Sequence, residues 1–143
     1  MIVIDTGPLF AIYDNRDRYH NSVRQYLEQM RPSISLSPYV LAELDYLVQT
    51  RFGAKVELSM LNDISNGAFV LESFDANDIA ACIKIIEKMN NQEIGLTDAS
   101  VVHLAARNNT NTIMTLDHKH FNPMRNSKNK PFKLVPEQIT WAI

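Results

Sequence analysis

The stretch MIVIDTGP (residues 1–8) decides the fold, because an apolar run passes directly into residues that start helices. The run from Met1 to Asp5 is typical of a buried strand. Asp5 or Thr6 can cap a following helix, and Pro8 suits the first turn of that helix. The chain therefore begins with a strand that leads straight into a helix, and Asp5 stands at the junction.

The same alternation continues along the chain. Helices are predicted where apolar residues recur at helical spacing, and short β-like runs between turn residues predict strands. The predicted helices are His20 to Met30, Pro38 to Phe52, Ala54 to Asn66, Asp75 to Asn90, and one capped by Thr97 that runs to Asn108; the predicted further strands are Ser33 to Leu36, Ala68 to Ser73, Thr112 to Asp117 and Lys133 to Val135. Strands separated by helices predict the α/β class, with three layers and a central parallel sheet of four to five strands.

Length and composition predict one ordinary globular domain over residues 1–143. Hydrophobic residues make up 45% of the chain and charged residues 21%, which is enough apolar surface for a packed core. No apolar run approaches the ~18 residues of a membrane span, and the first residues lack the pattern of a signal peptide. We therefore expect a cytoplasmic protein without membrane contact. Cys82 is the only cysteine, so no internal disulfide can form, and its apolar helical neighbours favour core packing.

The charge distribution says more than the net charge of −2, which argues weakly against a protein that coats nucleic acid. Residues 118–136 contain no Asp or Glu. The same stretch holds five cationic residues, namely Lys119, Arg125, Lys128, Lys130 and Lys133. It is either a solvated basic segment or a phosphate-binding patch, and the sequence leaves both interpretations open.

Two aspartates follow apolar strands. In open α/β sheets, ligands bind outside the carboxyl ends of the strands, where the winding direction reverses. Asp5 and Asp117 both stand at that end of a predicted strand. Each has an ordinary structural interpretation, Asp5 as a helix cap and Asp117 as a turn residue. Their coincidence at strand ends favours a site.

Asp98 is singled out by helical spacing. It shares a face with Val101, Val102 and Ala105, so we expect it to face the interior. Buried aspartate is rare unless it is paired or bound to metal. A favourable charge at the start of a helix is the structural alternative. Both roles can coexist.

A further acid on the helix from Pro38 to Phe52 is less certain from pattern alone. Glu43 lies on one flank of the apolar stripe, and Asp45 lies about as far round on the other. Periodicity does not choose between them.

Four pieces of the chain, in order, resemble PIN-domain nucleases, and among them the VapC-type toxins of toxin–antitoxin pairs. The pieces are Ile2-Val3-Ile4-Asp5-Thr6, Leu41-Ala42-Glu43-Leu44, Gly95-Leu96-Thr97-Asp98-Ala99-Ser100, and Ile113-Met114-Thr115-Leu116-Asp117 with Phe121 after it. The resemblance covers nearly the whole chain and implies a three-layer PIN-like fold. It also implies an endoribonuclease of transfer or ribosomal RNA, a homodimer, and inhibition by a small antitoxin held by amphipathic helices between Pro8 and Phe52.

Residue by residue, the resemblance implies a cluster of four acids with threonines in support. The acids are Asp5, Glu43, Asp98 and Asp117; the supporting polar residues are Thr6, Thr97 and Thr115, with Thr97 orienting Asp98. Family members often carry a fifth acid shortly after the last aspartate, whereas this chain has His118-Lys119-His120 there. A second metal ion is therefore in doubt, and these three residues are candidate RNA contacts.

The chemistry of such a cluster requires a cation. Converging carboxylates repel one another and stay partly protonated unless a divalent ion neutralises them. Mg²⁺ or Mn²⁺ suits oxygen ligands and can present water to a phosphodiester. We expect Asp5 and Asp98 to be direct ligands, while Glu43 and Asp117 bind through water, bind a second ion or orient the attacking water.

Three alternatives stay open, and a fourth, the phosphatase, is disfavoured. His118 and His120 would act as acid and base in a metal-independent ribonuclease. An aspartyl-phosphate phosphatase needs a second Asp two residues after Asp5, where this chain has Gly7. A PIN nuclease of RNA processing would work without an antitoxin, and a PIN-like module would bind RNA or a partner without cutting.

Overall fold

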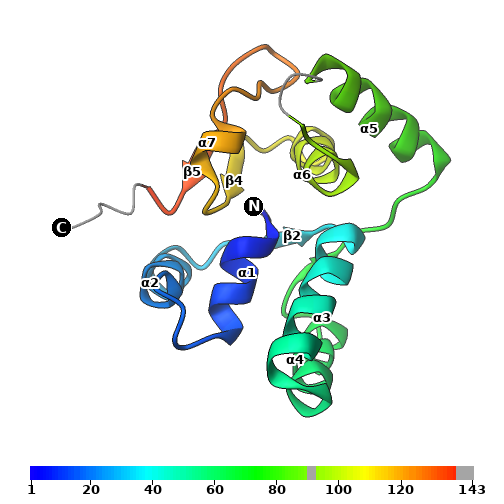
Figure 1. Cartoon of the computed structure of the whole chain (residues 1–143). Coiled ribbons are helices and arrows are strands. Elements are labelled where there is room, and N and C mark those ends of the chain that lie inside the picture. Colours follow the sequence, from blue (N-terminus) through cyan, green and yellow to red (C-terminus); the bar gives the residue numbers. More distant parts are fainter. Residues whose placement is uncertain (90–92, 138–143) are drawn as a thin grey trace.

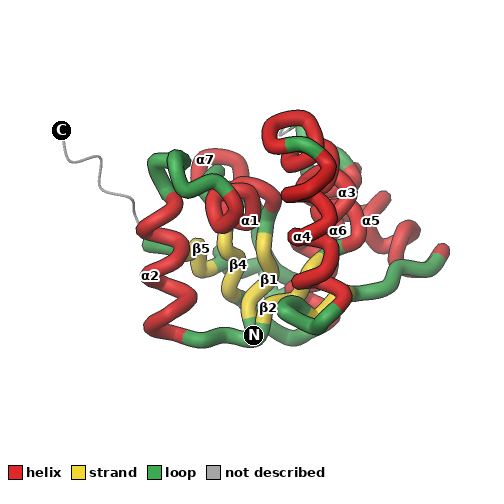
Figure 2. Tube along the Cα trace, turned by 90° about the horizontal axis from the view of Figure 1, so that it is seen from below, coloured by secondary structure: helices red, strands yellow, loops and turns green. Residues whose placement is uncertain are grey.

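The computed structural model describes residues 1–89 and 93–137, which form a five-stranded parallel sheet covered by helices. The strands lie side by side in the order β3-β2-β1-β4-β5. Figure 2 labels β2, β1, β4 and β5 as neighbours in that order. Their bounds are Ile2–Ile4 (β1), Ile34–Leu36 (β2), Val70–Leu71 (β3), Thr112–Met114 (β4) and Lys133–Val135 (β5). In the register, Val3 is the partner of Ser35 on one side and of Ile113 on the other.

Helices cover both faces of the sheet (Figure 1). One group follows β1 and β2 and packs together, with α1 against α2 and α3, and α3 against α4. The other group crosses back over the sheet, with α5 packed on α6 and α6 on β1 and β4. The bounds are Thr6–Tyr13 (α1), His20–Met30 (α2), Pro38–Phe52 (α3), Ala54–Ser65 (α4), Ala76–Lys88 (α5), Leu96–Arg107 (α6) and His118–Phe121 (α7). The predicted three-layer α/β/α fold is confirmed.

The winding direction reverses between β1 and β4. From β1 the chain moves outward to β2 and β3, then returns across the sheet to β4 and continues to β5. The carboxyl ends of β1 and β4 therefore flank the position where open α/β sheets bind ligands. The first residues after these strands are Asp5 and Thr115.

The core forms around β1 and α6. Every residue of β1 is buried, and six of the twelve residues of α6 are buried on both its sheet side and its α5 side. Cys82 is buried, as predicted. None of the helices in the described residues is long and apolar enough to cross a membrane.

Several predicted bounds are wrong in detail. The helix assigned to a Thr97 cap begins at Leu96, and Gly95 occupies the cap position, so Thr97 lies inside α6. The strand predicted to end at Asp117 ends at Met114, because Asp117 caps the short helix α7 that the sequence pattern missed. The strand predicted over Ala68 to Ser73 contains only two residues. The predicted end of α5 at Asn90 lies outside the described residues.

Candidate functional site

Asp5 lies at the carboxyl end of β1 and holds a largely buried carboxyl group. It occupies the cap position of α1, but its side chain makes no capping hydrogen bond. Instead, the hydroxyl of Thr115 donates to Asp5 Oδ2 over 3.0 Å. Burial raises the pKa of Asp5 to about 6, and the negative charges of Asp98 and Glu43 add to the rise, while hydrogen bonds from the Thr6 backbone and Thr115 oppose it. An isolated carboxylate is therefore disfavoured at this position.

Thr115 joins the end of β4 to Asp117. The backbone N–H of Asp117 donates to Thr115 Oγ1 over 3.0 Å, while the same hydroxyl donates to Asp5. Thr115 is fully buried. The predicted supporting role of Thr115 thus has a direct geometric basis, because one hydroxyl links two of the four acids.

Asp98 lies in the first turn of α6 beside the same strand ends. We predicted that Asp98 faces the interior; its side chain is 24% exposed, so it is half-buried at the edge of the core. Burial raises its pKa; the charge of His120 opposes the rise, and the charges of Asp117 and Glu43 add to it. The helical spacing identified the correct face, but the start of α6 reaches the protein surface.

Glu43, and not Asp45, belongs with these acids. The charge of Glu43 acts on both Asp5 and Asp98, although Glu43 itself is exposed on α3. Asp45 faces Glu57 of α4 instead, and their hydrogen bond raises the pKa of Glu57. Periodicity did not choose between Glu43 and Asp45. The neighbouring helices decide, because the flank of α3 with Glu43 lies toward Asp98 of α6 and the flank with Asp45 lies against α4. Below, the acid cluster means Asp5, Glu43, Asp98 and Asp117.

Two serines that sequence reasoning missed tie together the helices that carry Glu43 and Asp98. Ser37 caps α3 by accepting from the N–H of Tyr39, and its hydroxyl lies 2.7 Å from that of Ser100 on α6. Ser100 also donates to the carbonyl of Thr97. Both serines are fully buried. The sequence signal for Ser37 was its place before Pro38, which indicates a cap but not a contact with α6.

The three candidate RNA contacts on α7 have different surroundings. Lys119 is exposed, as expected for a phosphate contact. His118 has its Nε2 atom buried, and that atom has no hydrogen-bond partner among the described residues. His120 faces the acid cluster, with Nδ1 3.2 Å from Asp117 Oδ2 and Nε2 3.9 Å from Asp98 Oδ2.

The donor set fits a hard divalent cation that keeps part of its water shell. Carboxylate oxygens predominate, and Asp5 and Asp98 have raised pKa values because burial and neighbouring acids disfavour their charged forms. The buried hydroxyl of Thr6, next to Asp5, has no hydrogen-bond partner among the described residues, so an oxygen donor beside the acids is left unsatisfied. Within residues 1–89 and 93–137, no three His, Cys, Asp or Glu side chains form a ready-made metal-binding group. A fully protein-ligated ion is thus not indicated.

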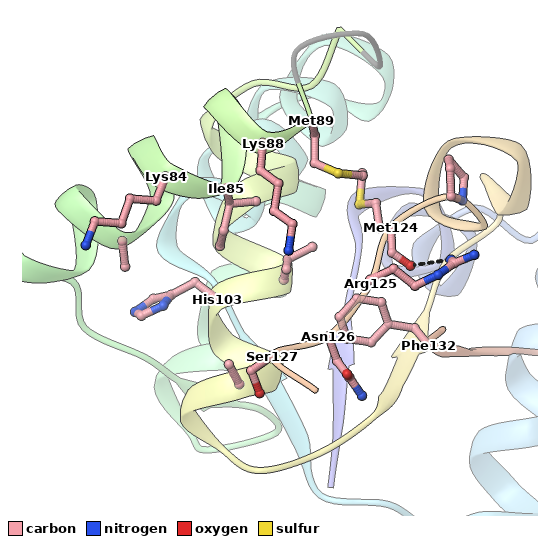
Figure 3. A pocket seen from close by; sticks show the side chains of 14 residues that line it. Lys84, Ile85, Lys88, Met89, His103, Met124, Arg125, Asn126, Ser127 and Phe132 are labelled. Atoms are coloured by element: carbon pink, nitrogen blue, oxygen red, sulfur yellow. Dashed lines mark hydrogen bonds between the residues drawn. The ribbon is translucent and has the colours of Figure 1, made fainter. Parts of the chain in front are cut away.

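A pocket of about 410 Å³ lies apart from the acid cluster, between α5, α6 and residues 123–132 (Figure 3). Its lining includes the apolar side chains of Ile85, Met124 and Phe132. Lys84 and Lys88 of α5 also line it. None of the four acids contributes to its wall. The chemistry expected from the acids is therefore not located in this pocket.

Comparison with known proteins agrees with this geometry. Residues 2–124 match the model of the PIN domain family. The chain is 38% identical over 135 residues to ribonuclease VapC26 of Mycobacterium tuberculosis. This alignment covers 94% of this chain and 100% of that relative.

Two solved structures share the fold. The Mycobacterium tuberculosis VapC20 structure, described as a sarcin-ricin loop cleaving toxin, has a TM-score of 0.76 at 16% identity and covers 84% of this chain and 92% of its own. The Rickettsia felis VapBC2 structure, bound to a promoter DNA fragment, has a TM-score of 0.67 at 22% identity and covers 94% and 98%. By its match to the family model and its similarity to a VapC ribonuclease, the chain belongs to the PIN-domain family and is of the VapC type, in agreement with its five-stranded parallel sheet.

Proposed function

We propose that this protein is a metal-dependent endoribonuclease, the toxin of a type II toxin–antitoxin pair, and that it cleaves structured RNA such as transfer or ribosomal RNA in the cytoplasm. Residues 1–143 would act as a single nuclease domain. The similarity to ribonuclease VapC26 supports the activity and substrate class. The preferred cofactor is Mg²⁺ or Mn²⁺, because the acid cluster offers hard oxygen donors.

The observation that carries this proposal is the raised pKa of Asp5 beside Asp98 and Glu43. A protein that used these acids only for stability would pair them with cations, since unpaired buried charge is costly. The cluster instead keeps them close together, with His120 as the one basic side chain that the structure places in contact with them within residues 1–89 and 93–137. Carboxyl groups with shifted pKa values, at the edge of a sheet where ligands bind, are typical of functional sites.

Each acid has a distinct place in the proposed reaction. Asp5, held by Thr115, and Asp98, at the start of α6, are positioned to hold the ion. When bound, the ion supplies positive charge to the phosphate and a polarised water for in-line attack. Exposed Glu43 orients that water and takes its proton. Asp117 keeps α7 in place by accepting from the backbone N–H of His120.

The RNA would approach over the basic segment 118–136. Its five cations, including Lys119 beside the acid cluster, are all exposed. Lys119 lies in α7 and Lys133 in β5, while the other three cations lie in the connection between these elements. Phosphate contacts of this kind position a nucleic acid without reading its bases.

An antitoxin would bind to the helices between Pro8 and Phe52. A hollow of about 520 Å³ lies between α1 and α2, with Ile12 and Leu27 in its lining. Its charged lining consists of Arg31 and of Arg24, which is paired with Glu28 over 2.8 Å. In the same range of residues, the side chain of Tyr46 on α3 is 61% exposed. This aromatic surface is open to a docking partner. An amphipathic segment with acidic residues matches this chemistry. The VapC resemblance also implies a homodimer.

Cleavage of structured RNA by the purified protein tests the proposal. We expect turnover with Mg²⁺ or Mn²⁺ that is abolished by EDTA and by Asp98→Asn. Asp78→Asn is the matched control, because Asp78 is an aspartate in the first turn of the neighbouring helix α5 and lies outside the acid cluster. Cleavage that survives both EDTA and Asp98→Asn contradicts the metal mechanism.

The antitoxin assignment has a separate test. A short reading frame beside the gene, encoding a DNA-binding N-terminus and an amphipathic tail, should yield a protein that co-purifies with this chain and suppresses cleavage. Metal-dependent cleavage without such an inhibitor would instead identify an RNA-processing nuclease.

A further inference from the structure

The pocket between α5, α6 and residues 123–132 is an apolar hollow of about 410 Å³ (Figure 3). Ile85 of α5 and Val102 of α6 line one part of it, and Met124 and Phe132 line the part formed by the connection after α7. Concave sites of this size, mainly apolar with a few polar groups, are typical of binding sites for small organic groups. The lining therefore suits a ligand with a compact apolar body.

The pocket carries cations on two sides and no acid in its lining. Lys84 and Lys88 of α5 lie on one side, and Arg125 lies on the other (Figure 3). Both lysines are exposed, and neither has an ion pair within residues 1–89 and 93–137. Arg125 donates to the carbonyl oxygens of Asn122 and Met124, which leaves its charge without a counter-ion. Cations on both sides favour a ligand with more than one anionic group.

The pocket lies a short distance along α6 from the acid cluster. Val102 and Ala106, which line it, come one and two helical turns after Asp98. At 1.5 Å per residue, this corresponds to roughly 6 to 12 Å along the helix axis. Successive phosphates of a stacked strand lie about 3.4 Å apart along its axis, so a few nucleotides span the same distance. An RNA strand held at the acid cluster can therefore extend to the pocket.

His103 adds a hydrogen-bonding group to the wall of the pocket. Its Nε2 lies 2.8 Å from Asp78 Oδ1. Because an ionised carboxylate only accepts hydrogen bonds, Nε2 carries the proton, and Nδ1 of the neutral ring is an acceptor. Adenine, cytosine and guanine each carry an amino group that donates to such an acceptor.

We propose that this pocket is a subsite for the RNA, which takes one unstacked base of a single-stranded segment against Met124 and Phe132. The phosphates on either side of that base contact Lys84, Lys88 and Arg125. The proposal rests on the ribonuclease function proposed above. Single-stranded RNA is commonly bound in this way, with bases on apolar or aromatic side chains and the backbone on cations. The subsite thus adds a contact to a base, which the basic segment alone does not supply.

Binding of short RNA to the full chain in EDTA tests this without cleavage. The probes are labelled single-stranded hexamers of adenosine, of cytidine and of uridine, and an abasic hexamer with the same backbone, measured by fluorescence anisotropy. We expect at least one base-bearing hexamer to bind ~10-fold or more tightly than the abasic hexamer, the scale of one stacked base. The methyl NMR signals of Ile85 and Met124 should shift more with that hexamer than with the abasic one.

Ala106→Phe places a ring in the pocket from an exposed position of α6. It should abolish the preference for a base-bearing hexamer and leave affinity for the abasic hexamer within about twofold, because surface substitutions away from a contact have small effects. Ala80→Phe is the matched control, since Ala80 is an exposed alanine of the neighbouring helix α5 that does not line the pocket. It should keep the preference.

Lys88→Gln tests the phosphate contacts and serves if Ala106→Phe does not fold, as judged by its thermal melt. It should weaken binding of every hexamer and lower the slope of log affinity against log salt by about 0.7, the value for one phosphate contact on a single strand. Lys55→Gln, at an exposed lysine of α4 outside the pocket, is its control and should leave the slope unchanged. An unchanged slope in Lys88→Gln contradicts the subsite.

The outcomes separate this proposal from the function on which it rests. Equal affinity for base-bearing and abasic hexamers, or a base preference that persists in folded Ala106→Phe, overturns the subsite. Methyl shifts of Ile85 and Met124 with laurate but not with the hexamers also overturn it, and assign the pocket to an amphiphilic carboxylate. Metal-dependent cleavage of structured RNA leaves the nuclease function intact in each case. A base preference without any such cleavage supports the subsite and contradicts the nuclease function.

Discussion

The acid cluster and a second group of charges, which meets the C-terminal part of α6, use the same residue types with opposite results. The second group, here called the compensated cluster, consists of Glu72, Asp78, His103 and Arg107. His103 Nε2 lies 2.8 Å and Arg107 Nη1 lies 3.2 Å from Asp78 Oδ1, and Arg107 Nη2 lies 3.4 Å from Glu72 Oε1. Every acid of this group therefore has a cationic or ring N–H partner.

The pKa directions follow from this difference. Backbone hydrogen bonding from Asp75, followed by His103, holds the pKa of Asp78 below its usual value. Partial burial raises the pKa of Glu72, but hydrogen bonds from Ser35 and Asn108 and the charge of Arg107 outweigh it, so the net shift is downward. In the acid cluster, burial and like charges shift Asp5 upward. The acids of the compensated cluster are thus neutralised within the protein, whereas for the acid cluster we propose a metal ion as the neutralising charge.

The largest expected effect is on catalysis. Asp98→Asn should reduce RNA cleavage by roughly 10²- to 10³-fold, the scale on which loss of one charge-stabilising group acts. Asp78→Asn should leave cleavage within about twofold, because the compensated cluster contacts no part of the acid cluster among the described residues. Single-turnover cleavage at saturating metal measures both. Equal losses of cleavage in the two variants would contradict the assignment of different roles to the two clusters.

The second effect concerns stability and pH in the presence of EDTA. The unfolded state releases the Asp5 proton near pH 3.8 and the folded state near pH 6, so the native state binds more protons in between. The free energy of unfolding therefore falls as pH rises from about 4 to 6 and is level above that range. The shift from 3.8 to about 6 corresponds to about 3 kcal/mol.

Asp5→Asn should remove most of the fall in unfolding free energy between pH 4 and 6. It should also make the metal-free protein more stable at pH 7 than the wild type. Urea denaturation at pH 4, 5, 6 and 7 measures the change. A wild-type stability that rises over this range would show that Asp5 is compensated in the folded state.

The third effect is stabilisation by metal. An ion that binds only the folded state adds ~2.7 kcal/mol at 100 times its dissociation constant, which raises Tm by several degrees in a chain of this size. Thermal melts with Mg²⁺ and Mn²⁺ should show this rise in the wild type and in Asp78→Asn. The rise should be absent in Asp98→Asn. An equal rise in Asp98→Asn would place the ion elsewhere.

The smallest effect tests the compensated cluster itself. Arg107→Ala removes the guanidinium from Glu72 and Asp78, and also its contact with the Phe74 ring, whose centroid lies 5.3 Å from Cζ. Because the side chain of Arg107 is 32% exposed, we expect a loss of only about 1 kcal/mol in unfolding free energy. RNA cleavage should be unchanged. Chemical denaturation gives the first quantity, and a decline in cleavage of the folded variant would connect the two clusters.

Sequence alone determined the alternation of strands and helices, the parallel sheet, and the place of Asp5 at a strand end. These features are local, because apolar period, capping residues and turn residues act within a few positions of the chain. The same reasoning placed Asp98 on the correct face of α6. It did not place the start of that helix, because Gly95 takes the cap position without any side chain to signal it.

Only the tertiary structure decided which residues meet. Glu43 joins the acid cluster while Asp45 meets Glu57, since the crossover brings α6 to one flank of α3 and α4 to the other. His120 reaches Asp98 because α7 follows β4 beside the start of α6. A helical period specifies which direction a side chain takes from its own helix, but not which neighbour packing and chain crossover place there.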